Sequence, residues 1–549
     1  MNALTIALVT LGAYILAYRF YARFFGRKIL ALDPARKTPS SEFEDGVDFV
    51  PTRPVILFGH HFASIAGLGP ILGPAIAVIW GWLPAVLWIL FGSIFIGCIH
   101  DISAIFISLR NRGRSIGDVT RSIAGPRAHI LFLVLIFFTL SLCMGTFVRV
   151  IATLFSDAFH PESVIPVAAL IVLAVVVGVL VYKKGVNLAA ATIVSLLLMF
   201  VSIWFGIAHP VTGVGQSSWV YLLITYAFIA SVLPVWLLLQ PRDYLNSYQL
   251  VIGMALMYIG LFIFRPTISA PVINHVSTGL PPLFPFLFIT IACGAISGFH
   301  SLVSTGTTSK QLTRETDAVP IGFGGMLAEG LLAMIVVLAC TSGVSETQWF
   351  DHYSSWEAAQ GLAAKMEAFV SGAGVFVSKT GIPLEIAKSF IVVMAVGFAM
   401  TTLDSGTRLL RYNLEELGEG LNIGVLRNRY IAALVAVSGI GYFSLMTIGG
   451  KPAGLALWAL FGTTNQVLAS LGLLIVSLFL YRLRKPIIYT IIPMVGMMLM
   501  TGTAMILKLR ESLLNGQWPL FIIGSLILIL VVWLVIESLL AFKKTMREA

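Results

Sequence analysis

The sequence predicts an all-α, polytopic membrane protein with about fifteen transmembrane helices. Hydrophobic residues make up 58% of the 549 residues and charged residues 11%, whereas soluble domains carry about a quarter charged residues. Apolar runs of about 20 residues, the length that spans a bilayer, recur from Leu4 to Phe542 with no long polar stretch between them. No soluble fold buries this much apolar surface, so we expect one membrane domain.

The net charge of +10 does not indicate a nucleic-acid partner. The Lys and Arg residues stand in short clusters between apolar runs, where the positive-inside rule accounts for them. The four cysteines lie inside apolar runs without CxxC or Cys/His spacing, which favours packed thiols over a metal site. We therefore expect the lipid bilayer and a small-molecule substrate as partners, with no cofactor and no resident metal.

The first apolar run begins at the N-terminus and should be retained as a helix. Only Met1 and Asn2 precede it, while Arg19 and Arg23 follow it, and no small-residue cleavage site is present. The N-terminus is thus expected outside. The chain then divides into an additional N-terminal transmembrane helix, a cytoplasmic linker, a transport core, and a cytoplasmic loop with the C-terminal helices, at residues 1–30, 31–55, 56–411 and 412–549.

Each predicted span is bounded by charges, Pro/Gly or polar turns. The spans are 3–20, 56–80, 83–108, 128–155, 163–182, 187–208, 217–239, 248–264, 285–307, 321–343, 385–410, 430–447, 454–481, 486–507 and 518–542. Basic clusters occupy alternate loops, which supports an odd number of spans, an outside N-terminus and a cytoplasmic C-terminus in a plasma (inner) membrane. The sizeable external segment, 345–383, holds Trp349 and an amphipathic stretch from Trp356 to Val370, which either anchors at the membrane surface or covers an entrance.

The second span is interrupted. Residues 66–74 read AGLGPILGP and hold three glycines and two prolines, so an uninterrupted helix is not expected. Backbone groups freed at membrane depth are tolerated where they line a cavity, and half-helix ends there attract ions and substrates. Ser64, Gly67 and Gly69 are the first candidates for substrate contact, the alternative being a kink that only eases packing.

The stretch 297–309 is rich in small polar residues. In a helix Ser301, Ser304 and Thr305 share one face, and their hydroxyl oxygens are of the type that hard cations prefer. They are candidates for the coupling-ion site and are expected to face the unwound part of the second span. Helix packing through small polar residues is the alternative.

These motifs resemble the carbon starvation protein A family. The resemblance rests on residues 59–74 (GHHFASIAGLGPILGP), the pair His100 and Asp101, residues 297–301 (SGFHS) and residues 402–405 (TLDS), and it extends over nearly the whole chain. The family implies a secondary transporter for peptides or pyruvate in the amino acid, polyamine and organocation superfamily.

The resemblance also implies a five-plus-five inverted-repeat core with broken first and sixth helices. With the span at 56 as core helix one, the sixth is 217–239, which contains Ser231 and Pro234, and the span at 285 is core helix eight, where sodium-coupled relatives place serine and threonine ligands. Ser231 is on this basis a further substrate-binding candidate.

Ionisable residues within spans are functional candidates by default. Arg149 either binds a substrate carboxylate or reaches to the outer interface, and Asp404 is either a proton site or the partner of Arg408. His61 and His300 are candidates for carrying a coupling proton. His100 and Asp101 are assigned to gating, and a metal site formed by His60, His61, His100 and Asp101 is a minor alternative.

The predicted function is import of a peptide or of a small carboxylate such as pyruvate, driven by a proton or sodium gradient and used in carbon starvation. A membrane nutrient sensor or a passive channel is the alternative, and an enzyme is not expected because no catalytic motif is present.

Overall fold

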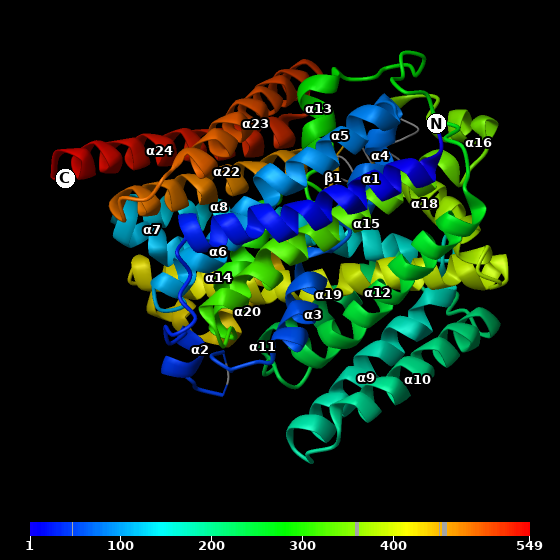
Figure 1. Ribbon diagram of the computed structural model, residues 1–549, viewed down its shortest axis with the longest axis horizontal. Helices are drawn as coiled ribbons and strands as arrows, with labels where there is room; N and C mark the ends of the chain where they lie inside the picture. The colour runs from blue at the N-terminus through cyan, green and yellow to red at the C-terminus, as the bar shows by residue number, and fades with distance from the viewer. Residues whose placement is uncertain (47, 357–361, 449–450, 453–457, 549) are drawn as a thin grey trace.

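The apolar runs form helices that lie side by side along the long axis of the computed structural model, which describes residues 1–46, 48–356, 362–448, 451–452 and 458–548 (Figure 1). Within these residues, 11 helices are long and apolar enough to cross a membrane, or up to 12 if a bent pair counts as one span. Helices satisfy their backbone hydrogen bonds internally, as the bilayer requires. The polytopic all-α architecture is confirmed, whereas the number fifteen stays a prediction.

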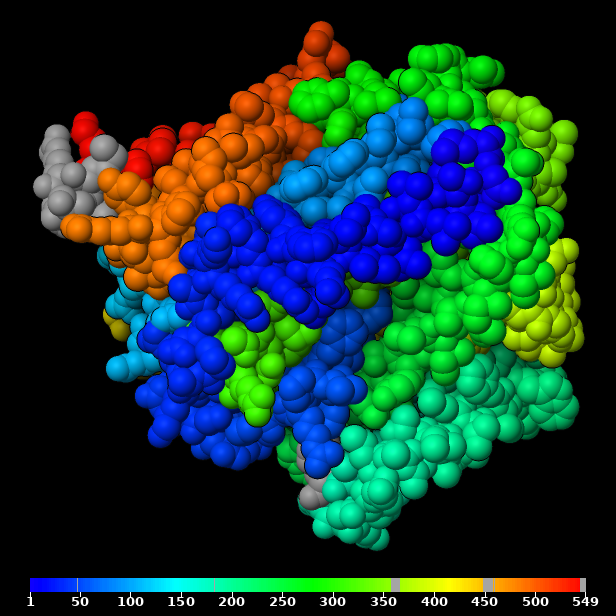
Figure 2. Space-filling model, viewed as in Figure 1, coloured from blue at the N-terminus to red at the C-terminus, as the bar shows by residue number. Residues whose placement is uncertain are grey.

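The first helix lies on the surface of the bundle (Figure 2). It comprises α1 (Ala3–Leu16) and two π-helical segments, Ala17–Ala22 and Phe25–Ile29, and α1 packs against α15. The following linker contains one short helix, α2 (Pro39–Glu42).

The second span is broken as expected. It consists of α3 (Pro54–Ile65) and α4 (Gly69–Ala77), followed by a 3₁₀ turn at Val78–Trp80, with a bend of 46° between the two parts. Residues 66–68 are non-helical, while Gly69 is already the first residue of α4. The predicted interruption is therefore confirmed. It occupies the N-terminal end of the Gly/Pro cluster at 66–74.

The helices after the break continue to the middle of the chain. They are α5 (Trp82–Gly92), the π-helical Ser93–Gly97, α6 (Cys98–Arg110), α7 (Ile116–Ala124), α8 (Pro126–Leu154), a 3₁₀ turn at Pro161–Ser163, α9 (Val164–Tyr182), α10 (Leu188–Ala208), α11 (Gln216–Val232) and α12 (Leu239–Phe264). The α9–α10 hairpin lies at the edge of the bundle (Figure 1).

A second broken span appears where a continuous helix was expected. The predicted span 285–307 consists of α13 (Leu283–Thr290) and α14 (Gly298–Gly306), with residues 291–297 between them outside any helix. The expected sixth core helix at 217–239 is instead α11, which ends at Val232 before α12 begins at Leu239. Residues 233–238 connect α11 to the next long helix, α12, so the predicted break at Ser231 to Pro234 is the end of a helix, whereas the interruption in 285–307 falls between two short helices of one predicted span.

The remaining elements follow the second break. They are 3₁₀ turns at Thr308–Lys310 and Glu315–Asp317, the π-helical Val319–Phe323, α15 (Gly324–Ser342), α16 (Glu346–His352), α18 (Leu362–Ser378), α19 (Leu384–Gly420), a 3₁₀ turn at Gly424–Arg427, α20 (Arg429–Leu445), α22 (Trp458–Arg482), α23 (Ile488–Leu514) and α24 (Trp518–Glu548). A short antiparallel pair, β1 (Thr447–Ile448) and β2 (Lys451–Pro452), precedes α22.

The two broken spans begin similar successions of elements. The first break is followed by the span α5–α6, the short α7 and the long α8, and the second by α15, the short helices α16 and α18, and the long α19. Moreover, α12 packs against α3 and α22 packs against α14. The pair α20 and α22, beyond the predicted core boundary at 411, thus packs with the rest of the bundle.

The external segment covers α4. Trp349 is fully buried, and the Tyr353 hydroxyl donates a 2.6 Å hydrogen bond to the carbonyl of Ala75 in α4. Helix α18 packs against α4, α12, α15 and α19. The described part of 345–383 is therefore packed against the bundle, whereas residues 357–361 of the predicted amphipathic stretch lie outside the described residues.

Candidate functional site

The two helix breaks lie against each other. A Cβ atom on Gly69 would overlap the side chain of Cys293, which belongs to the second break. A Cβ atom on Gly73 would stand 2.5 Å from the carbonyl oxygen of Thr290, the last residue of α13. Glycine at these two positions therefore lets α4 approach the second interruption closely, as small residues do between membrane helices.

Backbone groups at the second break are satisfied from another helix. Asn465 of α22 accepts a 2.9 Å hydrogen bond from the Phe299 amide and donates a 2.9 Å bond to the Ser297 hydroxyl. The N-terminus of α14 is thereby capped by a side chain far away in the sequence, because Ser297 does not cap it itself.

Polar groups at the first break are less completely satisfied. The described residues provide no hydrogen-bond acceptor for the amides of Leu68 and Gly69, which open the N-terminus of α4. The side chain of Thr402 in α19 lies against Gly67, and its buried hydroxyl has no partner among the described residues. The positive end of a half-helix and a free hydroxyl therefore face the same interruption.

One buried polar network joins α3 to α12 and α19. His60 Nδ1 lies 2.6 Å from Asp243 Oδ2, within hydrogen-bond distance, and the Ser64 hydroxyl lies 3.3 Å from both Asp243 Oδ2 and the Ser405 hydroxyl. We call these residues, together with the group described next, the α3–α12–α19 network.

The same network contains an ion pair. Arg242 pairs with Asp404 at full burial, and the Tyr226 hydroxyl donates a 2.7 Å hydrogen bond to Asp404 Oδ2. Asp404 therefore pairs with α12 and not with Arg408, contrary to one of the two expected roles. Arg408 instead donates to the carbonyls of Ala230 and Leu233 at the end of α11.

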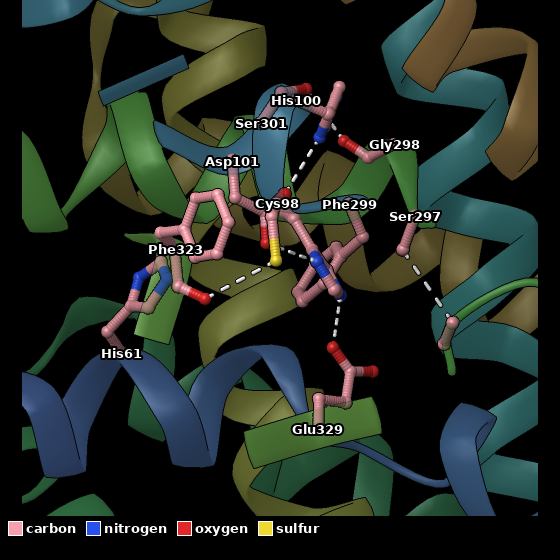
Figure 3. Close-up of polar contacts among 12 residues, drawn as sticks. His61, Cys98, His100, Asp101, Ser297, Gly298, Phe299, Ser301, Phe323 and Glu329 are labelled. Atoms are coloured by element: carbon pink, nitrogen blue, oxygen red, sulfur yellow. Dashed lines mark hydrogen bonds and ion pairs between the residues drawn. The ribbon is translucent and has the colours of Figure 1, made fainter. Parts of the chain in front are cut away.

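A second buried network joins α6, α14 and α15 (Figure 3). His100 Nδ1 lies 2.8 Å from Asp101 Oδ1, and His300 Nδ1 lies 2.9 Å from Asp101 Oδ2. His300 Nε2 lies 3.2 Å from Glu329 Oε2. These four residues, each at most 1% exposed, form the α6–α14–α15 network.

His60 and His61 point to different sides of α3. His60 belongs to the α3–α12–α19 network, while His61 Nδ1 forms a 2.9 Å hydrogen bond with the Thr308 hydroxyl. The predicted minor metal site is wrong for this reason, since its four residues do not converge. Within the described part of the chain, no three His, Cys, Asp or Glu side chains are arranged to hold a metal ion.

Two of the three hydroxyls of α14 are hydrogen-bonded to backbone groups, and their role in ion binding stays a prediction. Ser301 donates to the Gly298 carbonyl of its own helix, and Thr305 donates to the Ser301 carbonyl and accepts from the Ile116 amide of α7. Only the Ser304 hydroxyl lacks a partner among the described residues.

Two predicted substrate-binding residues lie elsewhere. Arg149 of α8 donates to Gln216 at the start of α11, at 3.2 Å. The Ser231 hydroxyl donates to the Phe228 carbonyl of its own helix, while its carbonyl accepts from Arg411.

Sequence reasoning missed several residues of the two networks and of the two helix breaks. Arg242 and Asp243 fell in a predicted loop because the start of α12 was placed too late. Glu329, a lone carboxylate inside an apolar run, was a signal that could have been used. Tyr226, Thr402 and Asn465 carry no charge within their spans, so only their neighbours in the fold distinguish them.

Cavities open at the end of the bundle that is predicted to be cytoplasmic. The larger, of about 620 Å³, lies between the start of α3, the α9–α10 turn and the start of α12. A polar cavity of about 230 Å³ is lined by Arg112, Arg114, Arg121, Lys310 and Glu416, among others. Relative to the two networks, both cavities lie toward the end of the bundle at which α3 and α12 begin.

Comparisons with known proteins give a consistent result. The family model for carbon starvation protein CstA matches residues 2–381 and 354–504. The peptide transporter CstA of Escherichia coli is 32% identical, over 88% of this chain and 78% of its own length. The pyruvate/proton symporter BtsT of the same organism is 31% identical, over 93% of this chain and 82% of its own length. Among solved structures, MhsT in complex with L-phenylalanine aligns with 89% of this chain and 98% of its own, at 14% identity and a TM-score of 0.44.

Proposed function

The chain belongs to the carbon starvation protein CstA family of membrane transporters, and we propose that it is a secondary active importer of a small organic carboxylate, either a peptide or an acid such as pyruvate. We further propose that a proton or sodium gradient drives the import and that the protein serves in carbon starvation. The relatives named above support the two substrate classes, since one is named for peptides and the other for pyruvate.

The observation that carries this proposal is the pair of facing breaks. Two helices interrupted side by side free backbone groups, which a membrane protein tolerates where they are buried in protein or line a cavity. The described residues leave the Leu68 and Gly69 amides and the Thr402 hydroxyl without partners. A carboxylate, the group that a peptide C-terminus and pyruvate share, matches these donors and the positive end of α4.

Counterflow in proteoliposomes tests the proposed activity. Labelled pyruvate and a panel of labelled dipeptides are offered to vesicles preloaded with the same unlabelled compound. We expect one class to exchange, whereas pyruvamide and C-terminally amidated dipeptides do not compete. A sensor would exchange nothing, and a channel would let the label equilibrate without any effect of preloading.

Substitution of Thr402 tests the site. Thr402→Val keeps the side-chain shape and removes the hydroxyl, so loss of one hydrogen bond to a charged group of about 1.5–3 kcal/mol should raise the half-saturating concentration about ten- to a hundredfold. The matched control is Thr407→Val on the same helix, because the Thr407 hydroxyl donates to the Leu403 carbonyl. Equal half-saturating concentrations in the two variants would place the carboxylate elsewhere.

A further inference from the structure

Four ionisable side chains form the α6–α14–α15 network with no permanent cation among them. Asp101 and Glu329 are fully buried, and within the described part of the chain their ion-pair partners are His100 and His300 alone. The other titratable groups facing the network are Cys98 of α6, Tyr14 of α1, His61 of α3 and Cys293 of the second break. None of these supplies a fixed positive charge.

The charges of this network can be balanced only by bound protons. A carboxylate buried in hydrocarbon without a compensating charge is strongly disfavoured, so each carboxylate must be neutralised by a histidinium or by its own protonation. The α3–α12–α19 network differs in this respect, because Arg242 supplies a permanent charge to Asp404.

The surroundings of His300 favour a bound proton. Both of its ring nitrogens face carboxylate oxygens, Nδ1 at 2.9 Å from Asp101 and Nε2 at 3.2 Å from Glu329. A neutral imidazole has one N–H donor and one lone pair, whereas an imidazolium donates from both nitrogens. Removal of the proton would leave a lone pair against a carboxylate oxygen, unless Glu329 or Asp101 is itself protonated.

The network also connects three helices, one of which begins directly after the second break. His300 lies in the first turn of α14, directly after the second break, while Asp101 is on α6 and Glu329 on α15. Loading and release of the proton therefore change the contacts that hold α14 to α6 and α15. The geometry points to this network, with His300 between Asp101 and Glu329, as the binding site for the coupling proton.

This inference rests on the proposed transport function and makes the coupling ion a proton. Its test uses the full-length protein in proteoliposomes with labelled pyruvate and labelled dialanine. Counterflow without a gradient measures binding and translocation, and accumulation under a pH gradient measures coupling. A pH-sensitive dye trapped in the vesicles records proton entry with the substrate.

We expect Glu329→Gln and Asp101→Asn to retain counterflow and to lose accumulation. A gradient of about one pH unit supports about tenfold accumulation when one proton accompanies each substrate molecule, so the ratio should fall about tenfold, to equilibration. Substrate-induced proton entry should vanish, and the pH profile of uptake should flatten. The control is Glu511→Gln, an exposed partner of Lys508 in α23, which should accumulate like the wild type.

The outcomes separate the two proposals. Absence of counterflow in the wild-type protein for both probes would reject the transport function itself. Wild-type accumulation and proton entry in both carboxamide variants, or accumulation that follows sodium and ignores the pH gradient, would reject the proton site while leaving transport intact. If one variant fails to fold, as shown by its elution in size-exclusion chromatography, the other decides.

Discussion

His60 and His61 are neighbours in the half-helix α3, and they bond to two different parts of the fold. Neighbouring residues on a helix point about 100° apart, so one imidazole reaches Asp243 in α12 and the other reaches Thr308 after α14. Helix α3 is thereby bonded on two sides to buried polar groups. A rearrangement on either side changes the contacts that hold this half-helix in place.

The Arg242–Asp404 pair is expected to stabilise the fold of the transport site. Removal of one partner from a buried pair costs about 3–5 kcal/mol, because the other charge is left uncompensated. We therefore expect Arg242→Gln and Asp404→Asn each to lower the thermal unfolding temperature in detergent markedly. The unfolding temperature of the double variant should fall by much less than the sum of the two single decreases.

A double-mutant cycle measures this coupling. The comparison pair is Lys508→Gln with Glu511→Gln, whose exposed ion pair should contribute about 0–1 kcal/mol. Additive losses at Arg242 and Asp404 would show that the two side chains contribute independently and that their contact is not a stabilising pair.

At the scale of elements, the linker after the first helix is bound across one end of the bundle. The Asp33 amide donates a 2.6 Å hydrogen bond to Glu315, which also pairs with Arg110 at 2.7 Å. Further along, the Ser40 hydroxyl donates to the Leu312 carbonyl and the Thr52 amide to the Gln311 carbonyl. The linker thus crosses the connection between α14 and α15 just before it enters α3.

Release of this linker can be followed with cysteine probes. Ser40 is fully buried and Ser41 is exposed, while the four natural cysteines are buried. Ser41→Cys should react rapidly with a water-soluble maleimide and Ser40→Cys slowly. Glu315→Gln, which weakens the contacts of Asp33 and Arg110 by about 1–3 kcal/mol, should accelerate the reaction at Ser40→Cys about tenfold or more.

The rate at Ser41→Cys serves as the control for maleimide access, and it should not change with Glu315→Gln. An unchanged rate at Ser40→Cys in the same background would mean that Glu315 does not hold the linker on the bundle.

At the scale of the whole molecule, the two chain ends lie at opposite ends of the bundle (Figure 1). The alternation of basic loops predicts that the N-terminus is outside and the C-terminus is cytoplasmic. One polar cavity, lined by Arg112, Arg114 and Arg121, lies at the end of the bundle that the charge rule predicts to be cytoplasmic. An odd number of spans follows from this arrangement.

Reporter fusions check the orientation. Alkaline phosphatase fused before Asn2 should be active, and a fluorescent protein fused after the last residue should fluoresce in the cytoplasm. A third fusion within the predicted cytoplasmic loop after Gly424 should match the C-terminal one. Reporters on the same side of the membrane at both chain ends would require an even number of spans and would reject the topology.

The sequence by itself determined the membrane class, the family and the first break. Apolar run length and the Gly/Pro cluster at 66–74 suffice for these, because the bilayer imposes a length on every span and backbone sterics forbid a regular helix through such a cluster. The sequence did not predict the second break, because residues 291–297 hold a single glycine and no proline and no local rule marks the interruption.

Only the tertiary structure decided which polar residues act together. Glu329 meets His300, and Asp404 meets Arg242 instead of the nearby Arg408, across 29 and 162 positions of the chain respectively. Helical periodicity places a residue on a face of its own helix, but the partner of that face depends on how the helices pack. The same packing places the Thr402 hydroxyl against Gly67 of the first break, where it has no partner among the described residues.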